Sequence, residues 1–228
     1  MGCKMMNSFS ILDINARQEK LIKDCGNIKC LVIGVGGIGN WVVLDLALLG
    51  VKHIILFDPD ILETSNLNRT IFKISQIGKP KTESLKELIL ERRPDVFIQC
   101  VNEYFDIDTH KDYCKSAYVY DCTDNNGTRA SLEDYKSEFE SYIKLGYDGF
   151  DATFVSNDFE SGSWGQDEDN RYTIIPSFFG TPQILGAMGV IETLVNKNKK
   201  INTTSFTITE LLKLIRRGTG YVEDNRGN

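Results

Sequence analysis

A chain of 228 residues, 41% hydrophobic and 25% charged, is long enough to bury a full core as one α/β domain without disulfide or metal support. Its net charge of −6 argues against nucleic acid as the main partner, because duplex binding requires a basic surface. The six cysteines form no C-x-x-C pair and no signal peptide is recognisable, so we expect no zinc site and a reducing, cytoplasmic compartment.

The first structural elements surround a glycine-rich turn. The apolar run at 28–34 predicts a buried strand, and the glycines that follow it predict a turn into a helix over 40–50. That helix is apolar on nearly every face, so it must be covered on more than one side, with the sheet and a second subunit as candidates. Such a turn brings the backbone close to a phosphate at a helix N-terminus. The turn glycines are Gly34, Gly36, Gly37 and Gly39.

The next strand and its connection carry polar groups suited to a nucleotide. A strand at 53–58 ends on Asp58, where dinucleotide-binding folds place the acid that holds the ribose. The connection at 59–79 is longer than usual, which favours a functional role. It contains Asp60, which either fixes the loop or serves the site, together with Asn66 and Arg69. An amide and a forked guanidinium are suitable donors for phosphate oxygens.

A helix beginning at Pro80 places lysines at its first turn. A lysine there is electrostatically unfavourable unless an anion is present, so Lys81 is a candidate phosphate ligand, whereas Lys79 is expected to be exposed. Further strands are predicted at 96–101 and 117–122, and Asp124 follows the second of them. A carboxylate facing phosphates requires a cation between them, so Asp124 is a candidate Mg²⁺ ligand; the alternative is that it caps the next helix.

After residue 140 the pattern changes. We expect one or two strands within 142–155, an acidic loop at 156–170, a strand at 171–179, and helices at 181–196 and 208–218. Prolines interrupt the apolar stretch at 174–194, so a membrane span is not expected. The predicted fold is a Rossmann-like, doubly wound, mainly parallel α/β sheet with an antiparallel extension in the C-terminal half.

Five of these blocks together resemble the ThiF/MoeB/HesA superfamily, which includes the ubiquitin-activating enzymes. They are the glycine turn, DPD at 58–60, SNLNR at 65–69, GKPK at 78–81 and DCTDN at 121–125. A weaker sixth block, ARQEKL at 16–21, is similar to the N-terminal segment of the family whose arginine reaches the ATP of a neighbouring subunit. On that match Arg17 acts in trans and the protein is a homodimer.

The resemblance implies one adenylation domain over 1–228, with an N-terminal arm at 1–27, a nucleotide-binding half at 28–140 and a partner-binding half at 141–228. It also implies ATP and Mg²⁺ as cofactors. The reaction expected is adenylation of the C-terminal carboxylate of a ubiquitin-like or sulfur-carrier protein whose tail ends in glycine. The roles implied are ribose binding by Asp58, phosphate binding by the glycines, Asn66, Arg69 and Lys81, and Mg²⁺ binding by Asp124.

The chain departs from the family pattern after Cys122, because no later cysteine exists. The zinc site and the thioester cysteine of many members are therefore expected to be absent, and Cys122 is expected to be packed rather than nucleophilic. The loop at 156–170 is a candidate cover for the partner's tail. Three alternatives stay open: adenylation of a peptide, other small carboxylate or modified tRNA; an NAD-dependent oxidoreductase; and a silent nucleotide-binding scaffold.

Overall fold

Seven strands form one sheet in the computed structural model, which describes residues 14–156, 177–195 and 204–219. The strand order is β3-β2-β1-β4-β5-β6-β7; the first five strands are parallel, and β6 and β7 are antiparallel to their neighbours. This is the doubly wound, mainly parallel sheet with an antiparallel extension that the sequence predicts. The strands are β1 (Lys29–Ile33), β2 (His53–Phe57), β3 (Phe97–Val101), β4 (Tyr118–Asp121), β5 (Ser141–Asp148), β6 (Asp151–Ser156) and β7 (Thr204–Thr207).

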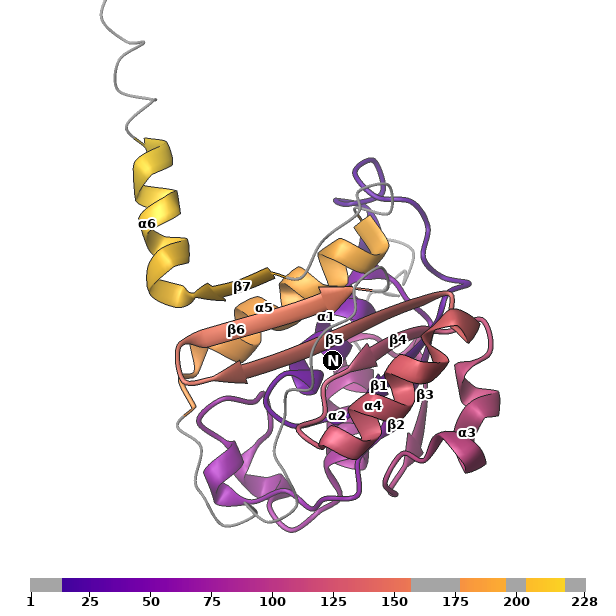
Figure 1. The fold of residues 1–228 in the computed structure, drawn as a ribbon. Helices are drawn as coiled ribbons and strands as arrows, with labels where there is room; N and C mark the ends of the chain where they lie inside the picture. Colours follow the sequence, from indigo (N-terminus) through magenta and orange to yellow (C-terminus); the bar gives the residue numbers. More distant parts are fainter. Residues whose placement is uncertain (1–13, 157–176, 196–203, 220–228) are drawn as a thin grey trace, which may run out of the picture.

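Helices cover both faces of the sheet (Figure 1). One face carries α1, α2 and α5, and the other carries α3 and α4, each layer with its own apolar core. The helix α6 stands away from the sheet at the end of β7. The helices are α1 (Gly39–Leu49), α2 (Lys81–Arg92), α3 (Ile107–Cys114), α4 (Asn126–Tyr135), α5 (Gly180–Val190) and α6 (Ile208–Thr219), and α5 continues into a π-helical turn (Ile191–Val195).

The helix α1 lies beside α5 on the same face of the sheet, and α5 itself packs on β5 and β6. Its side chains Val42, Val43 and Leu46 are fully buried, which the all-round apolar sequence requires. A methyl group at Gly186 of α5 would lie 3.0 Å from Cβ of Trp41, so the two helices approach closely at that glycine. Within one chain, therefore, the sheet and α5 cover two sides of α1, while Leu48 stays exposed.

Arg93 is a buried charge that joins three parts of the fold. It follows the last residue of α2, and its side chain is buried and paired with Asp95, with 2.9 Å between Nε and Oδ1. It also donates to the carbonyl of Ala47 near the end of α1 and, at 3.3 Å, to Oδ1 of Asn15. The ion pair and these hydrogen bonds compensate the buried charge. Because the bonds reach both Asn15 and Ala47, Arg93 links the N-terminal segment to α1.

Most of the elements expected from the sequence are confirmed, and two were missed. The helix α3 and the strand β7 were not predicted. Most of the strand expected at 171–179 and nearly all of the loop expected at 156–170 lie outside the described residues. None of the described helices combines the length and apolar character that crossing a bilayer requires.

Asp45 on α1 gives a testable pH dependence. Burial raises the pKa of its carboxyl from 3.8 to about 6, so the folded chain binds this proton more tightly than the unfolded chain does. The associated stabilisation is complete below pH 4 and is lost as the pH rises through about 6. At pH 7 we expect Asp45→Asn to raise the free energy of unfolding by about 1–3 kcal/mol in urea titrations.

At pH 4 the difference between Asp45→Asn and the wild type should nearly vanish. The matched control is Asp134→Asn on α4, whose side chain is exposed and which should change little at either pH. An equal effect of Asp45→Asn at both pH values would contradict the proposed cause.

Candidate functional site

The turn between β1 and α1 leaves no room for side chains at two of its glycines. Gly34 has φ +85°, and a Cβ there would lie 2.8 Å from the carbonyl oxygen of Cys122 on the β4–α4 loop. A Cβ at Gly39 would lie 1.9 Å from the carbonyl oxygen of Gly34. The first residue of α1 therefore packs against the backbone that directly follows β1, which only a glycine permits. A Cβ at Gly36 would meet nothing within 4 Å, so this part of the turn faces open space.

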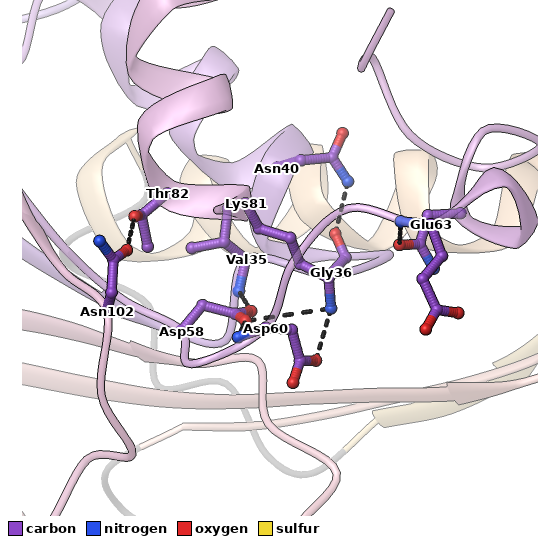
Figure 2. Close-up of polar contacts among 10 residues, drawn as sticks. Val35, Gly36, Asn40, Asp58, Asp60, Glu63, Lys81, Thr82 and Asn102 are labelled. Carbon is purple, nitrogen blue, oxygen red and sulfur yellow. Dashed lines mark hydrogen bonds and ion pairs between the residues drawn. The ribbon is translucent and has the colours of Figure 1, made fainter. Parts of the chain in front are cut away.

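Asn40 fixes the turn and was missed by the sequence analysis. Its fully buried side chain donates to the carbonyls of Gly36 (2.6 Å) and Gly37 (2.8 Å) and accepts from the backbone N–H of Ile71 (3.1 Å). Figure 2 shows its bond to Gly36. The next residue, Trp41, donates from its indole nitrogen to the carbonyl of Arg69 at 3.0 Å. The first turn of α1 thus holds the middle of the 59–79 connection.

Asp58 lies beneath the same turn at the end of β2. It is 6% exposed, and its oxygens accept from the backbone N–H groups of Val35 (2.6 Å) and Asp60 (2.9 Å). Burial raises the pKa of Asp58, while Lys81 and the two N–H groups act in the opposite direction. Each carboxylate oxygen can accept a second hydrogen bond, so Asp58 keeps the capacity to bind ligand hydroxyl groups.

Lys81 is a nearly buried cation at the first residue of α2. Its ammonium lies 2.6 Å from Oδ2 of Asp60 and 3.9 Å from Oδ1 of Asp58, as Figure 2 shows. The Lys81 side chain is 11% exposed, whereas that of Asp60 is 57% exposed. Burial and the positive end of a helix both disfavour a lysine here, so the two acids provide its compensation. Lys79, by contrast, is half-exposed and paired with Glu87 at 3.1 Å.

Asn66 and Arg69 lie on the connection held by α1, but their side chains make local bonds. The amide oxygen of Asn66 accepts from the backbone N–H of Glu63 at 3.0 Å. The guanidinium of Arg69 donates to the carbonyl of Ser65 (2.7 Å) and to the side chain of Asn68 (2.9 Å). Its Nε is buried and has no partner among the described residues. A buried N–H without an acceptor is costly, so this donor suits an anion from outside the chain.

Asp124 lies on the β4–α4 loop, which packs against Gly34. The N-cap of α4 is Asn125, whose side chain accepts from the N–H of Thr128 at 2.9 Å, so Asp124 does not cap the helix. Asp124 is exposed and has no partner within the described segments. Across those segments, no three acidic, histidine or cysteine side chains gather into a group that could hold a metal ion by themselves.

Arg17 lies apart from the other candidates. The neighbouring Gln18 donates to the carbonyl of Leu48 at 2.7 Å, which places this segment at the C-terminal end of α1. The helix is 11 residues long, so about 16 Å separates that end from the glycine turn. The structure thus gathers the glycines, Asp58, Asp60 and Lys81, places Asn66, Arg69 and Asp124 on adjoining loops, and leaves Arg17 at the far end.

Cys122 is a poor nucleophile in this setting. Burial, followed by the neighbouring charge of Asp121, raises the pKa of its thiol well above the ordinary value. Because the thiolate is the reactive form, the thiol stays unreactive at neutral pH. Cys100 and Cys114 are also poor nucleophiles, because burial raises the pKa values of their thiols to about 11.

Comparison with protein families matches residues 10–150, more than half of the chain, to the ThiF family. The chain belongs to the ThiF family. The match spans the glycine turn, the 59–79 connection and the β4–α4 loop, so the gathered residues are those of a ThiF-type domain.

Curated relatives of this ThiF domain include adenylyltransferases and a dehydratase. The chain is 36% identical over 107 residues to the tRNA threonylcarbamoyladenosine dehydratase of Haemophilus influenzae, covering 46% of this chain and 41% of that protein. It is 32% identical over 117 residues to the sulfur carrier protein ThiS adenylyltransferase of Escherichia coli, covering 50% and 45%. The chain thus spans under half the length of these relatives.

Solved structures share the fold. A crystal structure of E. coli MccB with MccA-N7isoASN has a TM-score of 0.67 at 20% identity, covering 81% of this chain and 65% of that one. A crystal structure of PaaA has a TM-score of 0.70 at 17% identity, covering 91% and 82%. At such identities the similarity concerns the ThiF-type fold alone.

The three hydrogen bonds of Asn40 give a testable stability effect. We expect Asn40→Ala to lower the free energy of unfolding by about 2–4 kcal/mol, because part-buried backbone groups of Gly36, Gly37 and Ile71 lose the side chain that bonds them. Urea denaturation measures the loss. The control is Asn68→Ala, which removes an exposed side chain and should cost under about 1 kcal/mol. A loss for Asn40→Ala no larger than for the control would contradict this assignment.

Proposed function

We propose that the chain adenylates the C-terminal carboxylate of a small ubiquitin-like or sulfur-carrier protein, with ATP as the nucleotide. The observation that carries the proposal is the nearly buried Lys81, held by Asp58 and Asp60 beside an open glycine turn. The name of the E. coli relative, a ThiS adenylyltransferase, supports the substrate class.

The residues present suit a nucleoside triphosphate. The open space at Gly36 lies at the N-terminus of α1, where backbone N–H groups and the helix dipole favour an anion. Asp58 would accept from the ribose hydroxyl groups, while Lys81, Asn66 and Arg69 would bind the phosphate oxygens. The unpartnered Nε of Arg69 fits such an acceptor. A dinucleotide cofactor would not require these phosphate donors on the 59–79 connection, so they disfavour an NAD-dependent oxidoreductase.

Asp124 would hold Mg²⁺. This ion is usually bound through one or two carboxylates, with phosphate oxygens and waters completing its shell, so a single exposed carboxylate fits. When bound, Mg²⁺ would neutralise charge on the phosphates.

In the proposed reaction an oxygen of the partner's carboxylate attacks the α-phosphorus of ATP. The bond from that phosphorus to the bridging oxygen breaks, pyrophosphate leaves with the bonding electrons, and an acyl-adenylate forms. The carboxylate is already ionised at neutral pH, so no proton has to be removed. Lys81 and Arg69 would stabilise the negative charge that develops on the leaving phosphate oxygens.

The partner protein would contact the C-terminal half of the chain, with its glycine-ended tail covered by the acidic loop at 156–170. The chain would also form a homodimer, in which Arg17 of one subunit completes the site of the other. The placement of Arg17 at the far end of α1 supports action in trans. A modified tRNA is less suitable as the substrate, because the chain carries a net charge of −6.

A matched pair of lysines tests the nucleotide site. We expect Lys81→Gln to weaken Mg·ATP binding by about tenfold or more, because the loss of an ammonium removes a charge-assisted hydrogen bond to phosphate. Lys79→Gln, two residues away at an exposed ion pair, should leave the dissociation constant unchanged. Isothermal titration calorimetry measures both. Equal effects of the two substitutions, or NAD binding tighter than Mg·ATP, would refute the assignment.

Exchange of labelled pyrophosphate into ATP then identifies the acid. We expect exchange in the presence of a carrier such as ThiS, and none with a version of the carrier that lacks its C-terminal glycine. Exchange with a free peptide alone would instead favour the peptide substrate, and ATP binding without exchange for any acid would indicate a scaffold.

The chain should form the adenylate without a thioester at Cys122. We expect Cys122→Ser to retain pyrophosphate exchange within about threefold, because the thiol is packed and its pKa is raised well above the ordinary value. Denaturing gels run with and without a thiol reductant provide the second measurement. A reductant-sensitive conjugate that disappears in Cys122→Ser would show that this prediction is wrong.

A further inference from the structure

The hydroxyl end of Tyr147 lies directly over the glycine turn. A Cβ built at Gly37 would lie 2.5 Å from Oη of Tyr147 and 3.1 and 3.2 Å from its Cε1 and Cζ. The three nearest atoms all belong to Tyr147, so the end of its ring occupies the space that a side chain at Gly37 would need. The adjoining Gly36 faces open space. The phenol therefore borders the turn at Gly37, whereas the turn at Gly36 stays accessible.

The pleat of β5 directs this ring toward the turn. Residues 143, 145 and 147 share one face of the strand, and Ile143 and Leu145 are buried in the same core as α1. Tyr147 is the last of the three and packs at the margin of that core. It is thus presented by the strand that joins the parallel sheet to the antiparallel extension.

The hydroxyl has only a long hydrogen bond within the described residues. Tyr147 donates to Oγ of Ser177 at 3.3 Å, whereas hydroxyl donors commonly lie 2.7–2.8 Å from their acceptor. Ser177 in turn accepts, through its carbonyl oxygen, from the side chain of Asn68 at 3.5 Å. A weak bond can be exchanged for a stronger one to a charged oxygen.

We propose that Tyr147 is the residue that positions the acyl group, donating its hydroxyl to the carboxylate oxygen that does not attack phosphorus. This assignment rests on the proposed adenylation. If the α-phosphate lies over Gly36 and Gly37, the attacking acid must approach beside it, and Tyr147 borders that position from the partner-binding half. A fixed donor there orients the attacking oxygen toward the α-phosphorus.

A stable mimic of the acyl-adenylate tests the assignment without knowledge of the natural acid. The probe is 5′-O-(N-glycylsulfamoyl)adenosine, whose glycyl carbonyl stands for the non-attacking oxygen. We expect Tyr147→Phe to weaken its binding by about tenfold, the effect of one hydrogen bond to a polarised oxygen. Binding of Mg·ATP and AMP should change by less than about twofold. Tyr135→Phe, at an exposed tyrosine in the last turn of α4, is the matched control.

The outcomes separate the two proposals. A wild-type chain that binds neither Mg·ATP nor the probe overturns the proposed function and the role of Tyr147 with it. A wild-type chain that binds both, with unchanged probe affinity in Tyr147→Phe, overturns the role of Tyr147 alone. A parallel loss of Mg·ATP and probe binding would assign Tyr147 to the nucleotide and also contradict the proposal.

The contact with Gly37 can be tested by stability alone. Gly37→Ala should destabilise the wild-type chain to urea more than it destabilises the Tyr147→Ala variant, because that variant lacks all three nearest atoms. An equal loss in both backgrounds would remove the geometric basis of the assignment.

Discussion

The fold depends on a close approach of backbone to backbone at the end of β1. Because Gly34 and Gly39 leave no room for a Cβ, the start of α1 packs closely against the backbone that follows β1, and its N-terminus opens at the carboxyl edge of the sheet. The carbonyls of the turn then need a donor, which Asn40 supplies. The same side chain accepts from Ile71, so the geometry of the turn also sets the position of the 59–79 connection.

Charge balance is the second constraint on the site. Lys81 is nearly buried at a helix N-terminus, and its compensation by Asp60 comes from a largely exposed carboxylate. The phosphate of the proposed nucleotide would compete with that carboxylate for the ammonium, so the weakened ion pair would offset part of the gain from the new contact. Asp58 is bonded to two backbone N–H groups beneath the turn, and in the proposed function it would bind the ribose from that position.

The fold of residues 28–140 was largely predictable because its signals are local: apolar runs, a glycine turn, and charges at strand and helix ends. The missed elements lack such signals. The helix α3 is short and mostly polar, and its N-cap at Asp106 was the one usable cue. The strand β7 has four residues and depends on pairing with β6. Asn40 was missed, although an amide in an apolar helix was a usable signal, whereas Tyr147 becomes visible only through its tertiary contact with Gly37.

The proposed adenylation would need few side chains. An acid that is already ionised needs no base, and neither described histidine lies on the face of the turn: His53 begins β2 at the opposite edge, and His110 lies on α3, on the other face of the sheet from α1. The proposed reaction would require fixed donors for developing charge and alignment of two anions that repel each other. Charges from residues 28–140 would meet the first requirement. The second would fall to the strand that joins the parallel sheet to its antiparallel extension, and in a sheet of this order that strand is β5.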